Sequence, residues 1–352
     1  MLTVSRSGSN VNVSSCERIL IVKPSSLGDV VHTLPAAEAI HRAAPEAKLD
    51  WLVNSEWAQL LEGIPFLNQV ITFPRREFRG ITGFRKAQKW ADLTLSQKKY
   101  DLVVDFQGLF RSAWLSRKTG CKNIAGFQQA RESAPLMYSE RVDLPDWHGM
   151  HAIDRNLRLA EEIGSDISSP EFTLPPGEDV LGIDESNTGG ILLHPFSRGK
   201  GKSLSTKEVI EFCAHVAPTP VLLVGMPARP LDITWPENVT DLLGQTNLRQ
   251  LIQLIRSSAW SVSIDSGPMH LAAALTDRVL SLHTWSNPYV VGPWQQKAWV
   301  WRDGELAQVC DLDAGKFPER RDRKKHFENK DRLFPQEEIA EISEFISSQF
   351  AT

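Results

Sequence analysis

Cysteine is scarce in this 352-residue sequence, and the four cysteines lie far apart. Cys16, Cys121, Cys213 and Cys310 form no CxxC pair and no Cys/His cluster. A structural zinc site or a disulfide framework needs several such residues at short, defined spacings, so the sequence argues against both. The same scarcity is typical of proteins that fold in a reducing compartment, and we expect a cytoplasmic location.

Long apolar runs are also missing. No stretch of about 18 apolar residues occurs, so the sequence predicts no transmembrane helix. The opening stretch MLTVSRSGSNVNVSSC is polar and serine-rich, without the apolar segment of a signal peptide. We therefore expect residues 1–17 to form a disordered extension in front of the folded part.

An excess of positive charge is absent as well, because the formal net charge is −4. The chain as a whole is no polycation, and any surface that binds anions must be local. Hydrophobic residues make up 41% and charged residues 23% of the sequence, as in ordinary soluble proteins. A chain of this length is predicted to form two domains.

What the sequence does contain is an alternation of short apolar runs with longer helical patterns. In the first half we predict strands in runs that are rich in valine and isoleucine. Near-continuous apolar runs separated by helices are typical of buried parallel strands. These runs are RILIV from Arg18, LDWLV from Leu49, QVITF from Gln69, YDLVVDF from Tyr100 and NIAGF from Asn123.

The second half repeats the alternation after residues 168–190, a stretch dense in proline, glycine, serine and acid that we interpret as an interdomain linker. The two halves together predict two doubly wound sheets of similar size. One lies in an N-terminal domain of residues 18–175, and the other lies in a C-terminal domain of residues 185–330. The predicted strands of the second sheet are ILLH from Ile191, PVLLV from Pro220, VTDLL from Val239, WSVSID from Trp260, RVLSLH from Arg278 and AWVWR from Ala298.

A last amphipathic helix is predicted within residues 333–352. Pro335 and paired glutamates open it, and one face carries Ile339, Ile342, Phe345 and Ile346. An apolar face of this kind needs a surface to bury against, and we expect the helix to cross back to the N-terminal domain.

Neither half carries GxGxxG after its first strand, and neither carries the P-loop GxxxxGK[ST]. Both absences weigh against a nicotinamide-dependent dehydrogenase and a nucleoside triphosphatase. Two facing doubly wound sheets still predict an α/β protein that binds its ligands in the cleft between the carboxyl ends of its strands.

The first motif that can carry chemistry is ILIVKPSSLGDVVHTLPA, residues 19–36, in which a strand breaks into a loop with Gly28 and Asp29. Glycine lets the backbone turn sharply or approach a ligand closely. Asp29 is either a catalytic carboxylate or the cap of the following helix, with Thr33 as a rival cap. The residues alone leave both interpretations open.

The second motif is SVSIDSGPMHLAAAL, residues 261–275, a strand followed by a short turn and a helix. Backbone N–H groups and the helix dipole at such a start favour an anion, and a diphosphate would fit. Alternatively, Asp265 or Ser266 only caps the helix, Pro268 opens its first turn and His270 is a buried structural residue. The two roles can coexist.

Cations gather in two further stretches. LLHPFSRGKGKSLS, residues 192–205, places Arg198, Lys200 and Lys202 beside glycines, which suits either a phosphate grip or a solvated loop. PRREFRGITGFRKAQKW, residues 74–90, is a basic arm with interleaved aromatic residues, so an anionic partner is indicated and nucleic acid must be considered. A second basic run, residues 320–332, is more typical of a solvated face.

Taken together, these motifs resemble glycosyltransferase family 9, the ADP-heptose:lipopolysaccharide heptosyltransferases. The opening motif is most similar to heptosyltransferase I, and so are YDLVVDFQGLFRSAWLSR from Tyr100 and ARESAPLMYSERV from Ala130. DSGPMHLAAAL and the run LLGQTNLRQLIQLIRSSAWSVSIDSG that leads into it resemble the general family signature. Several separated motifs in the same order cover nearly the whole chain after residue 17.

The resemblance implies a GT-B fold of two facing Rossmann-like domains, with the active site in the cleft between them. It implies inverting, metal-independent transfer of a heptose from ADP-L-glycero-D-manno-heptose to the Kdo of Kdo–lipid A, with Asp29 as the general base. The implied donor-binding residues are Ser197, Lys200, Lys202, Met226, Asp265, Ser266, Gly267 and His270. The implied acceptor-binding residues are Ser26, Gly28, Arg75, Arg76, Arg79, Arg85, Gln107, Arg111 and Arg131.

The resemblance also implies that no cofactor and no metal is needed. Lys202 and the backbone around Ser266 and Gly267 would stabilise the leaving diphosphate instead. The implied partners are a nucleotide sugar, an anionic lipid-linked acceptor and the inner face of the cytoplasmic membrane, in peripheral contact, but no nucleic acid.

Two alternatives stay open. Family members often carry an acid after Gly-x-Pro-x, whereas this chain carries Arg229. A family 9 enzyme that uses a different nucleotide sugar or acceptor in cell-envelope polysaccharide synthesis is therefore the first alternative. The basic arm suggests the second, a non-catalytic sugar- or nucleic-acid-binding protein.

Overall fold

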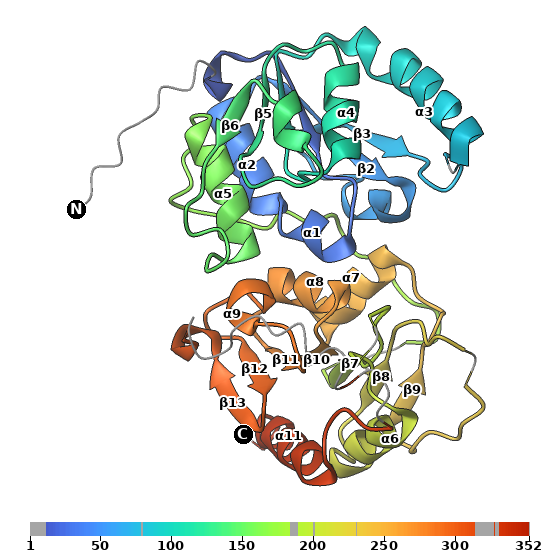
Figure 1. Cartoon of the computed structure of the whole chain (residues 1–352). Helices are drawn as coiled ribbons and strands as arrows, with labels where there is room; N and C mark the ends of the chain where they lie inside the picture. Colours follow the sequence, from blue (N-terminus) through green and yellow to red (C-terminus); the bar gives the residue numbers. More distant parts are fainter. Residues whose placement is uncertain are drawn as a thin grey trace. The chain divides into compact units, whose positions relative to one another are not determined.

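Strands and helices alternate along the chain in the computed structural model of the protein (Figure 1). The structure describes residues 12–78, 80–183, 189–199, 201–229, 231–313, 327 and 331–351. The chain divides into two compact units, Met1–Pro175 and Pro176–Thr352, and this division falls inside the predicted linker. Each unit is built around one sheet.

The sheet of unit 1 has six parallel strands in the order β3-β2-β1-β4-β5-β6. This is the strand order of a Rossmann fold, and the direction of winding reverses between β1 and β4. Burial on both faces explains the near-continuous apolar runs of β1, β4 and β5. The strands are β1 Arg18–Val22, β2 Lys48–Asn54, β3 Leu67–Phe73, β4 Leu102–Asp105, β5 Ile124–Phe127 and β6 Glu140–Val142.

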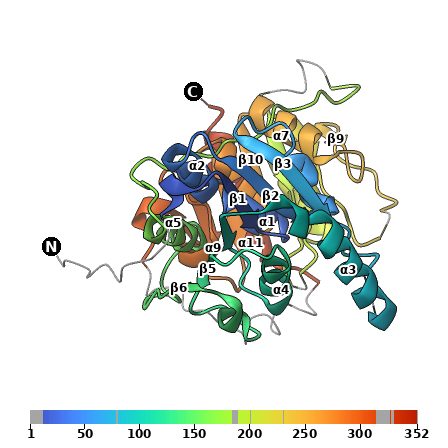
Figure 2. The ribbon, with the colours of Figure 1, turned by 90° about the horizontal axis from the view of Figure 1, so that it is seen from above.

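Helices lie on both faces of this sheet. α2 packs against α5, and α3 packs against α4. Figures 1 and 2 both show α3 reaching out from the periphery of the unit. The helices are α1 Leu27–Val31, α2 Leu34–Ala43, α3 Gly80–Thr94, α4 Phe110–Lys118 and α5 Ala152–Glu162, with short 3₁₀ helices at η1 Val13–Ser15, η2 Ser55–Leu60, η3 Ser96–Lys98 and η4 Ala134–Met137.

The sheet of unit 2 repeats this order and adds one strand, β13-β12-β11-β10-β7-β8-β9. All pairs are parallel except β12 with β13, and the winding reverses between β7 and β10. The strands are β7 Ile191–His194, β8 Val221–Leu223, β9 Val239–Asp241, β10 Trp260–Ile264, β11 Val279–His283, β12 Trp299–Arg302 and β13 Glu305–Gln308. The helices are α6 Thr206–His215, α7 Leu248–Ser257, α8 Gly267–Leu275, α9 Pro288–Val291, α11 Gln336–Ser348 and the 3₁₀ helix η5 Val309–Asp311.

All eleven strands predicted from apolar runs are present in the structure. The prediction missed β6 and β13. β6 has three residues, and β13 is a half-exposed edge strand with the sequence ELAQ, so neither produces an apolar run.

The expected disordered extension is wrong for residues 12–17, whereas residues 1–11 lie outside the described part. Val13 is fully buried in the short helix η1, and its N–H donates to the carbonyl of Ile163 at 2.9 Å. The Asn12 side chain accepts the N–H of Ser14 and so closes the turn. One buried valine and a cap anchor this stretch to α5.

The last helix forms as predicted, but the expectation that its apolar face packs on the N-terminal domain is wrong. Ile339, Ile342 and Ile346 belong to the core of unit 2, and α11 packs against α6. Phe345 adds ring contacts with Trp260 and Trp299, at centroid distances of 5.8 and 4.9 Å.

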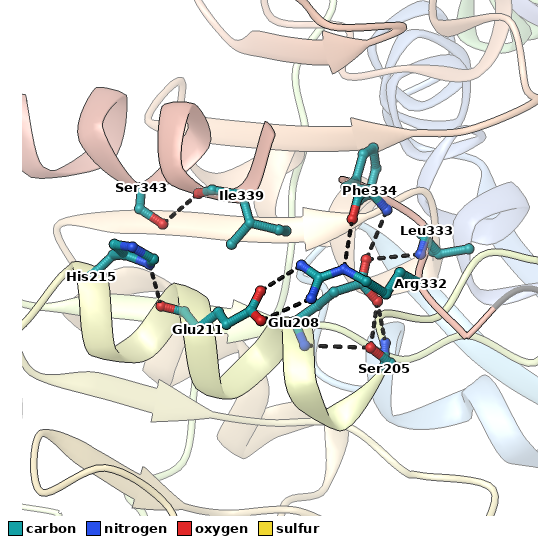
Figure 3. A network of polar contacts seen from close by, with 9 residues as sticks. All are labelled: Ser205, Glu208, Glu211, His215, Arg332, Leu333, Phe334, Ile339 and Ser343. Atoms are coloured by element: carbon teal, nitrogen blue, oxygen red, sulfur yellow. Dashed lines mark hydrogen bonds and ion pairs between the residues drawn. The ribbon is translucent and has the colours of Figure 1, made fainter. Parts of the chain in front are cut away.

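Polar contacts reinforce this docking at the start of α6 (Figure 3). Glu208 is fully buried, and its Oε1 accepts the N–H groups of Leu333 and Phe334, both at 2.8 Å. Its Oε2 accepts the N–H and hydroxyl of Ser205, so one carboxylate joins the helix cap to the returning chain. Beside it, Arg332 forms a two-pronged ion pair with Glu211. These donors satisfy a buried charge that would otherwise be costly.

Candidate functional site

In each sheet, the point at which the direction of winding reverses is called the switch point. Most of the residues singled out in the sequence lie in the loops that follow the strands at the two switch points. In unit 1, residues 23–29 follow β1 and residues 106–108 follow β4. In unit 2, residues 195–205 follow β7 and residues 265–267 follow β10. Ligands of doubly wound sheets bind at such a point, because the neighbouring connections leave toward opposite faces. The topology thus brings distant motifs to one place in each unit.

Asp29 lies in the first turn of α1. Its carboxylate accepts two hydrogen bonds from Ser26, the residue at the N-cap of this helix. Its Oδ2 accepts the N–H of Ser26 at 2.8 Å and the Ser26 hydroxyl at 2.7 Å. Ser26 is the N-cap, so Asp29 is not the cap itself but closes the first turn from inside the helix. Thr33 occupies the N-cap position of the next helix, α2, but its side chain makes no cap bond there, and its hydroxyl donates to the carbonyl of Asp29 at 2.9 Å. Gly28 is buried beside Asp29, which itself is only half-buried.

The loop in front of Asp29 is held from the end of β4. The N–H of Ser25 donates to Oε1 of Gln107 at 3.1 Å. The N–H groups of Gln107 and Gly108 donate in turn to Oδ1 of the buried Asp105, at 2.9 and 3.2 Å. Gln107, predicted as an acceptor contact, therefore also positions the loop that presents Asp29.

Asp105 accepts most of the side-chain hydrogen bonds at this end of the sheet, and it was not among the predicted site residues. Its Oδ2 accepts the hydroxyls of Ser112 and Tyr138, both at 2.8 Å. Burial raises the pKa of the Asp105 carboxyl, and the four hydrogen bonds oppose that rise. Burial and the nearby carboxylate raise the pKa of the Tyr138 hydroxyl. The available signal was an acid at the last position of a strand next to the switch point.

Five of the six predicted acceptor-binding arginines belong to the described residues, and these five are exposed on unit 1. Arg79 lies outside the described residues. Burial, and then the positive charge of Arg75, lower the pKa of Arg111, so these two side chains share one surface. Arg76 instead forms an ion pair with Glu56 at 2.5 Å. The others, Arg85 in α3 and Arg131 after β5, have exposed side chains.

In unit 2, an ion pair joins the loop after β7 to the turn after β10. The ammonium of Lys202 donates to Oδ2 of Asp265, and it also lies 4.5 Å from the ring centroid of Trp285. Burial alone would raise the pKa of the Asp265 carboxyl, but the charges of His283, Lys202 and His270 and the hydrogen bond from Lys202 outweigh it and lower the pKa to about 2. Asp265 is thus a carboxylate with a cation against it, not a helix cap.

The loop that carries Lys202 is folded back on itself. The N–H of Ser197 donates to Oγ of Ser203 at 2.9 Å, and the N–H of Gly199 donates to Oγ of Ser197 at 3.2 Å. The hydroxyl of Thr284 donates to the carbonyl of Gly201 at 3.0 Å. Lys200 lies outside the described residues, so of the two candidate lysines the structure places Lys202.

The helix start expected to hold an anion is formed by Ser266 and Gly267 at the beginning of α8. Ser266 is the N-cap, in extended conformation, and its hydroxyl lies 3.3 Å from Nδ1 of His194. Burial lowers the pKa of His194 to about 4, so this imidazole is neutral near pH 7. Gly225 (φ +123°) lies against the ring, since a Cβ there would be 3.1 Å from Nε2 of His194. His194 lies in a predicted strand, but it was not among the predicted site residues.

A second buried histidine stands behind Asp265. His283 is 1% exposed and lies between the hydroxyls of Ser281 and Ser286, at 2.7 and 3.0 Å. Burial lowers its pKa to about 4, against the opposing effect of Asp265. His270 in the first turn of α8 is half-buried, and its charge contributes to the low pKa of Asp265. Met226, the last predicted donor contact, is 73% exposed and lies beside Gly244.

The described part of the chain shows neither a cluster of metal-binding side chains nor a helix that could span a membrane. No group of three or more His, Cys, Asp and Glu side chains there is arranged to hold a metal ion. None of the described helices is long and apolar enough to cross a bilayer.

The sequence matches a known protein family. Residues 92–189 and 228–316 match the family model of "Glycosyltransferase family 9 (heptosyltransferase)". The chain is 30% identical over 298 residues to "Lipopolysaccharide heptosyltransferase 1" of Pseudomonas aeruginosa, an alignment that covers 78% of this chain and 81% of that protein. It is 26% identical over 293 residues to "Lipopolysaccharide core heptosyltransferase OpsX" of Haemophilus influenzae, covering 78% of this chain and 81% of the relative.

Solved structures share the fold. The glycosyl transferase family 9 structure from Veillonella parvula superposes with a TM-score of 0.73 at 17% identity, covering 97% of this chain and 99% of that one. The structure of the E. coli heptosyltransferase WaaC with ADP-2-deoxy-2-fluoro heptose gives a TM-score of 0.68 at 22% identity, covering 94% of this chain and 99% of that one. The predicted α/β class with two Rossmann-like parallel sheets, as in GT-B enzymes, is confirmed.

Proposed function

Because the chain belongs to glycosyltransferase family 9, the heptosyltransferases, we propose that it moves a heptose from ADP-L-glycero-D-manno-heptose to the Kdo of Kdo–lipid A. The observation that carries the proposal is the ion pair of Lys202 with Asp265, which directly precedes Ser266, the N-cap of α8. It places a cation beside the backbone N–H groups of Ser266 and Gly267, and a nucleoside diphosphate binds to such a combination of donors. The relatives are named for lipopolysaccharide heptose transfer, which supports this choice of donor and acceptor.

The donor diphosphate is proposed to bind at the switch point of unit 2. Ser266 and Gly267 offer backbone N–H groups, and Lys202 offers its ammonium from the facing loop. As the bond from the anomeric carbon to ADP breaks, negative charge grows on the diphosphate, and these groups stabilise it. Ser197, Met226 and His270 are proposed to contact the rest of the nucleotide sugar. The chain's own cations then supply the charge stabilisation, so the mechanism needs no metal or cofactor.

Asp29 is proposed as the general base. The acceptor hydroxyl attacks the anomeric carbon on the side opposite to ADP, so the configuration inverts, and its proton passes to the Asp29 carboxylate. Ser26 and Gln107 hold the loop that presents this carboxylate. Transfer requires the Asp29 end of unit 1 and the Lys202 end of unit 2 to act on one pair of substrates.

The acceptor is proposed to bind through the arginines of unit 1. Kdo and lipid A carry carboxylate and phosphate groups, and guanidinium groups bind such oxygens in pairs. Arg75 and Arg111 form the shared cationic surface, and Arg76, Arg79, Arg85 and Arg131 extend the set. Ser26 and Gly28 would lie next to the reacting sugar.

Peripheral contact with the inner face of the cytoplasmic membrane is part of the proposal, because the acceptor is a lipid. Exposed apolar side chains support it: Phe84 of α3 is 55% exposed and Phe110 of α4 is 47% exposed. Phe84 contacts the ring of Trp114, so the two helices present a joint aromatic surface beside the arginines. Aromatic rings next to cations suit an anionic lipid surface.

The first test is thermal-shift binding with ADP-heptose, ADP-glucose, UDP-glucose and GDP-mannose. A ligand that binds only the folded state raises the melting temperature, and we expect a clear shift with ADP-heptose. A shift with another nucleotide sugar in its place would move the function to a different donor, with Arg229 as the first residue to examine. Binding of generic RNA without any sugar-nucleotide shift would favour a non-catalytic protein.

The second test is transfer of labelled heptose to Kdo–lipid A, with and without EDTA. We expect equal rates in both, and an inverted anomeric centre by NMR of the product. Loss of transfer in EDTA that added Mg²⁺ restores would contradict the metal-independent mechanism.

A further inference from the structure

The loop after β11, residues 284–287, is a further element at the carboxyl end of the sheet of unit 2. β11 is the neighbour of β10 in this sheet, so the loop begins beside the turn that carries Asp265. Trp285 in this loop is half-buried, and its ring centroid lies 4.5 Å from the ammonium nitrogen of Lys202. The lysine therefore has a carboxylate and an aromatic face against it.

The backbone is fixed on both sides of this tryptophan. On one side, the hydroxyl of Thr284 donates to the carbonyl of Gly201 at 3.0 Å, which ties the loop to the segment that carries Lys202. On the other side, the guanidinium of Arg302, which is 1% exposed, donates to the carbonyl of Ser286. Thr284 and Ser286 are themselves buried. The position of the ring is thus set by the fold of unit 2.

A ring and a carboxylate hold an ammonium in different ways. The Asp265 carboxylate opposes the charge of Lys202, and it competes with any phosphate for the same ammonium. The face of an indole ring attracts a cation through its quadrupole but carries no net charge. Trp285 can therefore hold the ammonium while leaving its positive charge available to a diphosphate. The ring contact persists when phosphate oxygens take the place of the carboxylate.

We propose that Trp285 is a positioning residue for the donor diphosphate, whose ring holds the Lys202 ammonium in place while the ammonium exchanges Asp265 for phosphate oxygens. This inference rests on the proposed function. Trp285 exchanges no proton and touches no substrate, because it acts through Lys202.

The test is calorimetric titration of ADP into Trp285→Leu and Trp285→Phe. We expect about tenfold weaker binding in Trp285→Leu, since the Lys202 side chain is only 17% exposed and a cation–π contact shielded from water is near the upper end of its range. Phenylalanine keeps an aromatic face, so Trp285→Phe should retain most of the affinity. Unchanged affinity in Trp285→Leu, or an equal loss in both variants, overturns the proposal.

A double-mutant cycle shows whether the ring acts through the lysine. We expect Trp285→Leu to cause no further loss of ADP affinity in a Lys202→Met background, because no ammonium is left to hold. A loss of the same size in both backgrounds would mean that Trp285 contacts the nucleotide itself, and it overturns the proposal.

Trp299→Leu is the matched control for lost packing. Trp299 is also half-buried, but it starts β12 and so lies at the opposite end of the sheet from the loop 284–287. We expect a lower melting temperature and wild-type ADP affinity in this variant. If Trp299→Leu weakens ADP binding as much as Trp285→Leu does, lost stability explains both results and the proposal is wrong.

A measurement without ligand keeps the proposal separate from the proposed function. Protons above an aromatic face resonate upfield, so in protein with ¹³C-labelled lysine we expect the ε-CH₂ signal of Lys202 upfield of the ordinary lysine signals. The signal is assigned by its absence in Lys202→Met, and it should move back in Trp285→Leu. An ordinary position in wild type overturns the proposal, whether or not the tryptophan variants fold. An upfield signal in a protein that binds no ADP-sugar removes the proposed function but leaves the pairing of Lys202 with Trp285.

Discussion

Lys202 and Asp265 are 63 residues apart in the chain, yet they form an ion pair across the switch point of unit 2. Lys202 comes from the loop after β7, and Asp265 directly follows the strand β10. The pair is mostly buried, with side-chain exposures of 17% and 8%. The cation is therefore placed beside the start of α8 before any ligand arrives, so its position does not have to be created on binding.

The first prediction concerns this lysine. Lys202→Met is expected to weaken ADP binding by about 10- to 100-fold, since a charge-assisted bond to a phosphate contributes roughly 1.5–3 kcal/mol. Isothermal titration calorimetry with ADP measures the change. The control is Lys207→Met, which removes an exposed lysine of α6. Equal ADP affinity in Lys202→Met and wild type would show that another group grips the diphosphate.

The second prediction separates chemistry from binding. Asp29→Asn keeps an oxygen that can accept the N–H of Ser26, so α1 is expected to stay closed and the protein to fold. An amide cannot take the acceptor proton, and kcat is expected to fall by about 10²–10⁴-fold. Calorimetry should give unchanged ADP affinity. Turnover near the wild-type value would remove Asp29 from the role of base.

The third prediction is a pH dependence of stability. Burial lowers the pKa of His194 and His283 to about 4, whereas histidine in an unfolded chain titrates near about 6.5. Between these values the unfolded state binds more protons, so the free energy of unfolding falls as the pH drops from about 6.5 to about 4. Each histidine contributes about 2 kcal/mol of this loss between pH 8 and pH 5.

Urea unfolding at pH 8 and pH 5 measures this loss in His194→Gln and in wild type. The variant should lose less stability on acidification, by about 2 kcal/mol. His215→Gln is the matched control, because His215 is exposed at the end of α6. A variant with the same pH dependence as wild type would mean that His194 takes up its proton equally in both states.

The fourth prediction concerns the docking of α11. Ile342→Ala removes a fully buried side chain from the core of unit 2 and is expected to lower the free energy of unfolding by about 2–5 kcal/mol. Tryptophan fluorescence during urea unfolding reports it, because Trp260 and Trp299 contact Phe345 of the same helix. Glu341→Ala, exposed on the opposite face, should change the free energy by less than about 0.5 kcal/mol. Equal effects would contradict the docking on unit 2.

Strand positions could be predicted from sequence because a buried strand needs a continuous apolar run. Arg18–Val22 and Ile191–His194 were predicted with the bounds that the structure has. The docking of α11 could not be predicted, because an apolar face shows that a helix is buried but does not show which element it packs against. Its partner is α6, which starts 130 residues earlier in the chain, and no local pattern encodes such a pairing.

The candidate site was predictable where motif and switch point coincide, as at Asp29 and Asp265. The partners of these residues were harder to predict. Asp105 and His194 each stand at the end of a strand, where apolar periodicity stops and side-chain contacts depend on neighbouring strands. The strand order brings each beside its partners, and a single sequence does not show that order.

The bond between Glu208 and the N–H groups of Leu333 and Phe334 closes a loop of 125 residues. During synthesis, unit 1 can complete its own sheet while the ribosome still makes the rest. Unit 2 cannot, because its first helix waits for partners that lie 125 residues further along the chain. Its core is therefore exposed longest on the ribosome, and the late arrival of α11 is the step at which misfolding or capture by chaperones competes with folding.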